Sequence, residues 1–68
     1  MLKAQLLAFE QVIRKLQTEL QRRGYDPGAI DGSYGPNTRR ALIHFQSDNG
    51  LEPTGEVDAD TLGALGLG

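Results

Sequence analysis

Large apolar side chains recur at alternating spacings of four and three along the first twenty residues. They are Leu2, Leu6, Phe9, Ile13, Leu16 and Leu20. This spacing puts all of them on one face of an α-helix, and no Gly or Pro interrupts the pattern before Gly24. The pattern therefore predicts a helix from about residue 2 to residue 23. Arg22 and Arg23 suit its last turn, where the helix dipole is negative.

Two shorter helices are predicted in the rest of the chain. The segment 24–37 holds four glycines and two prolines, so we expect an ordered loop of tight turns there. Pro36 suits the first position of a second helix that runs to about Asp48. Its buried face carries Ala41, Leu42 and Phe45. Asp58 is a good N-cap for a third helix. The expected fold is all-α, a compact three-helix bundle with a Gly/Pro-rich loop and an extended first helix.

The chain repeats one pattern, over residues 20–42 and again over 45–65. Each copy has a helix end, a Gly, a Pro three positions later, a β-branched residue, an Asp and then a new helix. Asp31 matches Asp58 in this pattern, and Thr38 lies seven positions after Asp31 whereas Thr61 lies three after Asp58, so the first copy is longer by four residues, which lie within 32–37. We expect function in this longer loop. The matching β-branched residues, expected side by side in a short two-strand pairing, are Ile30 and Val57.

Composition excludes several classes of site. The chain has no cysteine, and its single histidine, His44, cannot complete a zinc site of about four ligands. Residues 1–24 hold five basic and two acidic groups, whereas residues 25–68 hold two basic and seven acidic groups. No basic stripe with interleaved aromatic residues results, so we expect no nucleic-acid partner, and neither a metal nor another cofactor.

The acidic residues of the second half do not indicate a glycoside hydrolase. They are Asp48, Glu52, Glu56, Asp58 and Asp60. Such catalysis needs two carboxyl groups that face each other across a cleft, and 68 residues leave no room for one around a polysaccharide. We therefore expect no enzymatic activity.

No segment is apolar enough to span a membrane or to act as a signal peptide. Polar residues such as Lys3, Gln5, Glu10 and Gln11 interrupt the first apolar stretch. We expect no membrane partner. The location is expected to be cytoplasmic if Met1 is the native start, and the cell envelope, periplasmic or extracellular, if the segment belongs to an exported protein.

Short motifs follow one another in a fixed order between residues 12 and 66. They are Leu16-Gln17, Gly24-Tyr25, Pro27-Gly28, Ile30-Asp31-Gly32, Tyr34-Gly35-Pro36, Thr38, Ala41, Phe45-Gln46, Gly50-Leu51, Thr54-Gly55, Val57-Asp58 and Thr61-Leu62. In this order they resemble the peptidoglycan-binding-like domain family. The resemblance implies a compact three-helix, non-catalytic cell-wall module attached to amidases, muramidases or transpeptidases. It also implies peptidoglycan, as glycan and stem peptide, as the partner.

Two features depart from the family pattern. Leu62 follows Thr61 where the family often has Trp, which removes one candidate stacking ring. Residues 1–11 extend the first helix about three turns beyond the family's usual start. The extension favours an alternative function, a protein-interaction or oligomerisation module. Its surface, expected to be buried in a homodimer or against a helix of the parent protein, comprises Leu2, Leu6 and Phe9.

The expected ligand groove lies between loop 31–37 and the start of the second helix. Its candidate residues are Asp31, Gly32, Ser33, Tyr34, Gly35, Asn37, Thr38 and Arg39. The free amides and positive dipole of a helix start attract anions such as stem-peptide carboxylates, which Arg39 or Arg40 can pair with in bidentate fashion.

Each candidate also has a purely structural interpretation. Tyr34 either presents its ring to a sugar face with a free hydroxyl, or folds back as a lid over the second helix. Asp31 either recognises a sugar hydroxyl or an amide, or makes local turn bonds. The pair Arg39 and Arg40 either binds a carboxylate or forms an ordinary solvated helix face. Tyr25, by contrast, is expected at the edge of the core.

Overall fold

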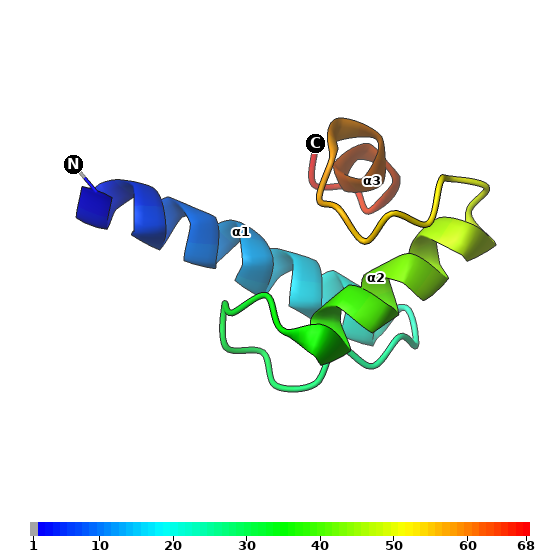
Figure 1. The fold of residues 1–68 in the computed structure, drawn as a ribbon, viewed down its shortest axis with the longest axis horizontal. Coiled ribbons are helices and arrows are strands. Elements are labelled where there is room, and N and C mark those ends of the chain that lie inside the picture. Colours follow the sequence, from blue (N-terminus) through cyan, green and yellow to red (C-terminus); the bar gives the residue numbers. More distant parts are fainter. Residues whose placement is uncertain (1) are drawn as a thin grey trace.

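The computed structural model describes the backbone of residues 2–68 and the side chains of residues 8–68. Over these residues the fold is all-helical, without strands. The helices are α1 (Leu2–Arg22), α2 (Pro36–Asp48) and α3 (Ala59–Ala64). The C-terminal half of α1 lies against α2, and α3 with the chain end lies above both helices in the view of Figure 1. The predicted three-helix fold is confirmed.

The core is formed by the apolar faces that the sequence pattern predicts. Its buried apolar residues are Ile13, Leu16, Leu20, Ala41, Leu42, Phe45 and Leu65. Burial of each large side chain contributes about 1.5–3 kcal/mol. Tyr25 is half-buried at the edge, as predicted, and its ring meets Phe45 edge-on at 5.7 Å between centroids. Its hydroxyl donates to Asp48 Oδ2 at 2.7 Å.

The first two helices end in the same way, and the third has the predicted cap. Past α1, the amide of Tyr25 donates to the Leu20 carbonyl at 2.8 Å, and past α2 the amide of Leu51 donates to the Gln46 carbonyl at 2.9 Å. A glycine with positive φ precedes each of these amides, as this type of helix end requires. At the start of α3, Asp58 Oδ1 accepts from the Thr61 amide at 2.9 Å, so the predicted N-cap is confirmed.

A buried glutamine in α1 fastens the loop that follows this helix. Gln17 has no exposed surface. Its Oε1 accepts from the Gly32 amide at 2.9 Å, and its Nε2 donates to the Ser33 carbonyl and to Thr38 Oγ1, each at 3.0 Å. The side chain therefore joins α1, the loop and α2. We call this set of bonds the Gln17 clamp.

A second glutamine makes the same set of bonds from α2. Gln46 is also fully buried. Its Oε1 accepts from the Gly55 amide at 2.9 Å, and its Nε2 donates to the Glu56 carbonyl and to Thr61 Oγ1, each at 3.0 Å. This Gln46 clamp joins α2, the second loop and α3. The sequence repeat is thus a repeat of one hydrogen-bonded unit.

The two clamps correct the register that the sequence suggested. Gly32 corresponds to Gly55 and Thr38 to Thr61, and the same 23 residues separate both pairs. At this offset the counterpart of Asp58 is Gly35, because each is the N-cap of the helix that follows. The prediction that Asp31 corresponds to Asp58 is therefore wrong.

The additional residues of the first copy also lie elsewhere than predicted. Asp31 corresponds to Thr54, and each side chain accepts from the amide two positions later, at 2.9 Å and 3.0 Å. The longer part of the first copy therefore precedes Asp31 and does not fall within 32–37. It runs from the end of α1 to Asp31, over a stretch that contains Ile30.

The predicted two-strand pairing of the loops is wrong as well. Residues 2–68 contain no strand. The two glutamines, and not the neighbouring loop, bond the amides of Gly32 and Gly55. Ile30 is 36% exposed, whereas Val57 packs against the core. A strand ladder between the loops would need backbone amides such as those of Gly32 and Gly55. The two glutamines occupy these amides, so the clamps take the place of a ladder.

Candidate functional site

Two pockets lie on either side of Gly35 and Pro36, at the start of α2. The Tyr34 pocket has a volume of about 490 Å³ and is lined by Tyr34, Gly35, Pro36, Arg39, Arg40 and Ile43. The Asn37 pocket has a volume of about 290 Å³ and is lined by Pro27, Ala29, Asp31, Ser33, Gly35, Pro36, Asn37 and Thr38. Their shared residues make one continuous surface at the place where the sequence predicts a groove.

Tyr34 packs into the fold more than its position between two glycines suggests. Its ring is half-buried against the core, and its hydroxyl donates to the Gly55 carbonyl. Burial raises the pKa of this phenol. Of the two interpretations of Tyr34, the one with a free hydroxyl is therefore wrong, and the contact favours the lid interpretation. The ring still forms part of the wall of the Tyr34 pocket.

Arg39 and Arg40 supply the positive charge at this surface. Arg39 donates to the Thr54 carbonyl at 3.4 Å, and Arg40 donates to Asn37 Oδ1 at 3.2 Å. Both side chains are exposed. Among residues 8–68, neither forms a salt bridge with an acidic side chain. Their charge is thus available to an anionic ligand.

The first turn of α2 has no side-chain cap. Gly35 occupies the N-cap position with extended backbone, φ −103° and ψ −175°, and has no side chain to accept from the first amides. Pro36 follows at the first helical position. The next residues, Asn37 and Thr38, line the Asn37 pocket. The positive end of the helix dipole therefore lies beside this pocket.

Three of the predicted site residues serve mainly to shape this surface. Asp31 Oδ1 accepts from the Ser33 amide and from Gln17 Nε2, and these bonds lower the pKa of its carboxyl group. Gly32 is buried, and its amide donates to Gln17 Oε1. Thr38 is 2% exposed, and its hydroxyl donates to the Pro27 carbonyl while it accepts from Gln17.

The remaining predicted residues, Ser33, Tyr34, Gly35, Asn37 and Arg39, line one pocket or both. Arg40, predicted with Arg39 as a partner for a carboxylate, also lines the Tyr34 pocket, and the pocket residues that the sequence analysis did not name as candidates are Pro27, Ala29, Pro36 and Ile43. Ile43 lies seven positions after Pro36, and Arg39 and Arg40 lie between them at helical spacing. The 3.6-residue period of the second helix could therefore have revealed this wall.

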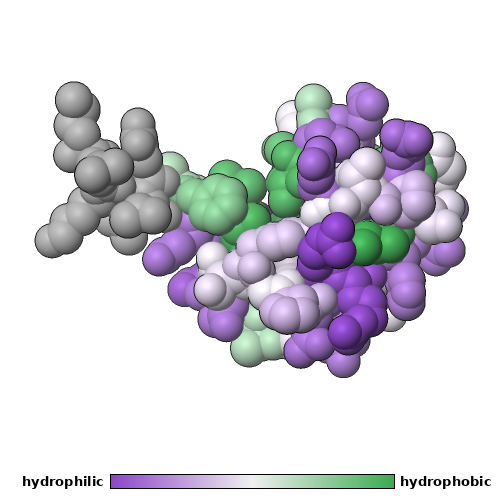
Figure 2. All heavy atoms as spheres, in the orientation of Figure 1, coloured by the Kyte–Doolittle hydropathy of each residue, from purple (hydrophilic) through white to green (hydrophobic). Residues whose placement is uncertain are grey.

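The predicted interaction surface lies at the other end of the molecule. The side chains of Leu2 and Leu6 fall outside the described residues. Phe9 is 56% exposed and Val12 is 39% exposed. Figure 2 shows apolar atoms gathered where α1 emerges from the rest of the molecule.

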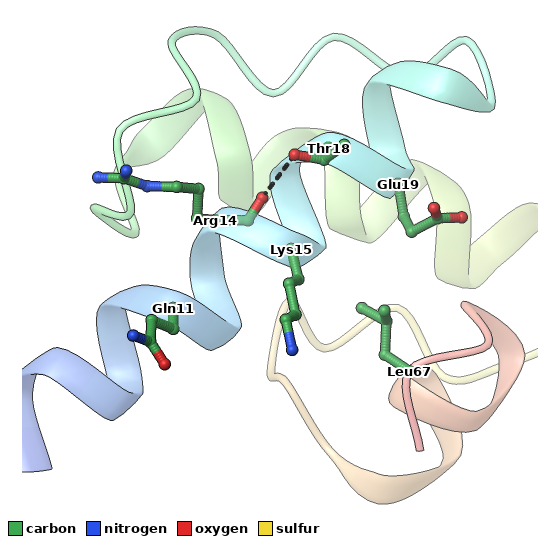
Figure 3. Close-up of a pocket in the computed structure, with 6 residues that line it drawn as sticks. All are labelled: Gln11, Arg14, Lys15, Thr18, Glu19 and Leu67. Carbon is green, nitrogen blue, oxygen red and sulfur yellow. Dashed lines mark hydrogen bonds between the residues drawn. The ribbon is translucent and has the colours of Figure 1, made fainter.

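A further groove, of about 330 Å³, separates α1 from the C-terminal segment. It is lined by Gln11, Arg14, Lys15, Thr18, Glu19 and Leu67 (Figure 3). Glu19 pairs with Arg22 at 2.6 Å, which lowers the pKa of its carboxyl group, and Thr18 donates to the Arg14 carbonyl. Thr18 and Glu19 are thus partnered within α1, and Arg14 donates to the Asp31 carbonyl at 3.5 Å, so Gln11 and Lys15 are the polar side chains of the groove that remain for a ligand. Among the described residues, no cluster of metal-ligating side chains occurs, and no helix is long and apolar enough to cross a membrane.

Comparison with known proteins gives a consistent match over most of the chain. The sequence profile of the family described as "Putative peptidoglycan binding domain" matches residues 10–65. The chain is 45% identical over 51 residues to the localization factor PodJL of Caulobacter vibrioides, an alignment that covers 75% of this chain and 5% of that protein. It is 36% identical over 53 residues to the N-acetylmuramoyl-L-alanine amidase CwlM of Mycobacterium tuberculosis, covering 78% of this chain and 13% of that protein.

The chain thus spans a small fraction of the length of these curated relatives. No solved structure matches it. The family match includes both glutamine clamps and both pockets at the start of α2, because all of their residues fall within 10–65. On this evidence the chain belongs to the peptidoglycan binding domain family.

Proposed function

We propose that this domain is a non-catalytic module that binds peptidoglycan and holds an attached protein at the cell wall, in the cell envelope. Membership of a family of binding domains supports the role. The short alignments with much longer proteins, one of them an amidase, support the idea of a module that accompanies other domains. The attached protein could be an enzyme or a localisation protein.

The uncapped first turn of α2 is the observation that carries the assignment of the site. Asn37 and Thr38 of this turn line the Asn37 pocket, and Arg39 and Arg40 line the Tyr34 pocket. Stem-peptide carboxylates match this charge. The apolar surfaces of Pro36 and Ile43 suit a sugar face or a small aliphatic side chain. We propose that the ligand lies across Gly35 and Pro36 and uses both pockets.

An open surface of this size suits weak binding. A Kd of about 10 μM to 1 mM corresponds to only about −7 to −4 kcal/mol. Sedimentation of the domain with insoluble peptidoglycan sacculi, at low salt and about 1 mM binding sites, measures such affinities directly. If the protein stays in the supernatant under these conditions, the proposal fails.

The variant Gly35→Asp tests the site while it preserves the fold. A Cβ at Gly35 meets no atom within 4 Å, and the extended backbone is the one that Asp58 adopts at the start of α3. The new carboxylate would cap the first amides and place a negative charge between the two pockets. We expect wall binding to fall at least about tenfold while the melting temperature stays equal or rises. Unchanged binding would exclude this surface as the site.

Arg39→Gln and Arg40→Gln test the charge separately from the cap. We expect each variant to bind a soluble muropeptide about three- to tenfold more weakly. NMR chemical-shift titration measures this change in affinity. Arg22→Gln is the matched control, because the side chain of Arg22 is 71% exposed in α1 and lines neither pocket. Equal losses in all three variants would indicate attraction by net charge alone.

A further inference from the structure

The apolar face of α1 continues beyond the part that the core covers. Ile13, Leu16 and Leu20 are fully buried on this face. Phe9, one helical turn before Ile13, is 56% exposed, and Val12 beside it is 39% exposed. The face therefore changes from covered to uncovered between Ile13 and Phe9, although the residue types do not change.

The sequence extends the same face toward the start of the helix. α1 begins at Leu2, and positions 2 and 6 continue the spacing that ends at Phe9. A helix face with large apolar residues at four successive positions of a 3.5-residue repeat is the pattern of a helix that pairs with another helix. Monomeric domains seldom leave such a stripe uncovered.

We propose that this face pairs with the same face of a second copy of the chain, in antiparallel orientation. Lys3 and Glu10 are seven residues apart, so they fall on one edge of the stripe. Antiparallel pairing that sets Leu6 against Phe9 of the second copy brings Lys3 opposite Glu10 of the second copy. Two-fold symmetry makes this pair twice. In a parallel pair Glu10 meets Gln5 of the second copy, and no attraction between opposite charges is formed.

The position of the covered core favours the same orientation. From Ile13 onward the face is already buried by the rest of the domain, whereas Phe9 and Val12 are exposed, so the proposed contact has to lie on the N-terminal side of Ile13. An antiparallel partner over this stretch places the two domain bodies at opposite ends, whereas a parallel partner brings them side by side. The N-terminal turns of α1 project away from α2 (Figure 1). The loop that contributes Asp31 and Ser33 to the Asn37 pocket approaches α1 at Glu10, so the Gly35→Asp variant, whose new side chain meets no other atom within 4 Å, separates the pairing from the wall-binding proposal.

Sedimentation equilibrium of the full chain over a concentration series from about 10 μM to 1 mM tests the inference, because it resolves dimers of the affinity that a short contact allows. We expect a reversible monomer–dimer equilibrium. Phe9→Ala should raise the dimer Kd at least about tenfold, because each dimer loses two apolar side chains from the contact. Since Phe9 is largely exposed in the single chain, the variant should keep the melting temperature measured at concentrations where the wild type is monomeric. A monomer at every concentration, or a dimer indifferent to Phe9→Ala, would overturn the proposal.

Charge reversal tests the orientation. Lys3→Glu and Glu10→Lys should each raise the dimer Kd about fivefold, because each change creates two like-charge pairs. The double variant restores both opposite-charge pairs and should return to within about twofold of the original Kd. A double variant no better than the singles would exclude the antiparallel pairing. The circular-dichroism spectrum of each variant checks that α1 stays helical.

Discussion

Gln17 and Gln46 fasten two loops with the same three bonds, but only the Gln17 clamp takes in an additional residue. Gln17 Oε1 also accepts from the Asp31 amide at 3.1 Å, and its Nε2 lies 3.2 Å from Asp31 Oδ1. The Gln46 clamp has no such fourth contact within residues 8–68. Asp31 is the last residue of the longer stretch that precedes the first clamp, so the added bonds hold that stretch in place.

The helices that follow the two clamps differ in what they leave open. Asp58 caps α3, whereas Gly35 leaves the first turn of α2 without a side-chain cap. At the offset of 23 residues, the positions of Arg39 and Arg40 are occupied by Leu62 and Gly63. The shared device builds the fold, and the differences between the copies concentrate charge and free amides at α2. A repeat thus indicates structure where its copies agree, and candidate function where they differ.

The largest expected effect comes from removal of either clamp. Gln17→Ala should lower the free energy of unfolding by about 2–4 kcal/mol, because it leaves several buried amides and carbonyls without partners. Gln46→Ala should cost somewhat less, about 1.5–3 kcal/mol, because fewer groups depend on it. Urea unfolding measures both, and Gln21→Ala, at an exposed position of α1, is the control. Equal losses for Gln21→Ala and Gln17→Ala would contradict the clamp.

The glycines that the clamps bind should differ in their tolerance of a side chain. Both have positive φ, 77° at Gly32 and 75° at Gly55. A Cβ at Gly32 would lie 3.0 Å from the Glu10 carbonyl oxygen, a backbone atom, whereas at Gly55 it would meet only side-chain atoms of Arg39 and Ile43 among its three nearest neighbours. We expect Gly32→Ala to cost about 2–3 kcal/mol and Gly55→Ala about 1–2 kcal/mol, by thermal unfolding.

Gly63→Ala provides the control for these glycine variants. Gly63 lies within α3 without positive φ, and a Cβ there meets no atom within 4 Å. Alanine should stabilise the helix by about 0.5–1 kcal/mol. If Gly32→Ala proved as harmless as Gly63→Ala, the close approach of the loop to α1 would be refuted.

Substitutions at the two N-cap positions, Asp58 and Gly35, should change the stability less, and in opposite directions. Asp58→Ala should destabilise the domain by about 0.5–2 kcal/mol, because the Thr61 amide loses its partner. Gly35→Asp should stabilise it by a few tenths of a kcal/mol, about what a capping side chain adds over Gly. Melting temperatures compare the two. A loss of stability in Gly35→Asp would mean that α2 starts in a geometry that a side chain cannot cap.

The smallest expected effect is the loss, in acid, of the contribution that Asp58 makes to the stability of the fold. Bonds to the Thr61 side chain and amide lower the pKa of Asp58 in the folded state. Its contribution is therefore complete above the unfolded pKa of about 3.9 and is lost as the pH falls through the lower folded pKa. Asp58→Asn should be less stable than the wild type near pH 7, and the gap should shrink by about pH 2.5, as followed by urea midpoints. A constant gap would contradict a pKa lowered by folding.

Helices, helix ends and the apolar core followed from the sequence because their causes are local. Apolar spacing selects the face of α1 that carries Ile13 and Leu16, Pro36 marks the start of α2, and Asp58 caps α3. Each signal operates within about one turn of helix, so it can be identified without knowledge of the rest of the chain.

Only the tertiary structure decided which polar residues are used inside the fold. Gln17 and Gln21 are both glutamines of α1, but the loop passes over Gln17 and leaves Gln21 in solvent. That path also fixed the register of the repeat and turned the hydroxyl of Tyr34 inward to Gly55. These outcomes depend on contacts between residues 9 to 21 positions apart, which bury polar groups only where every partner is present. No local pattern specifies such a set of partners.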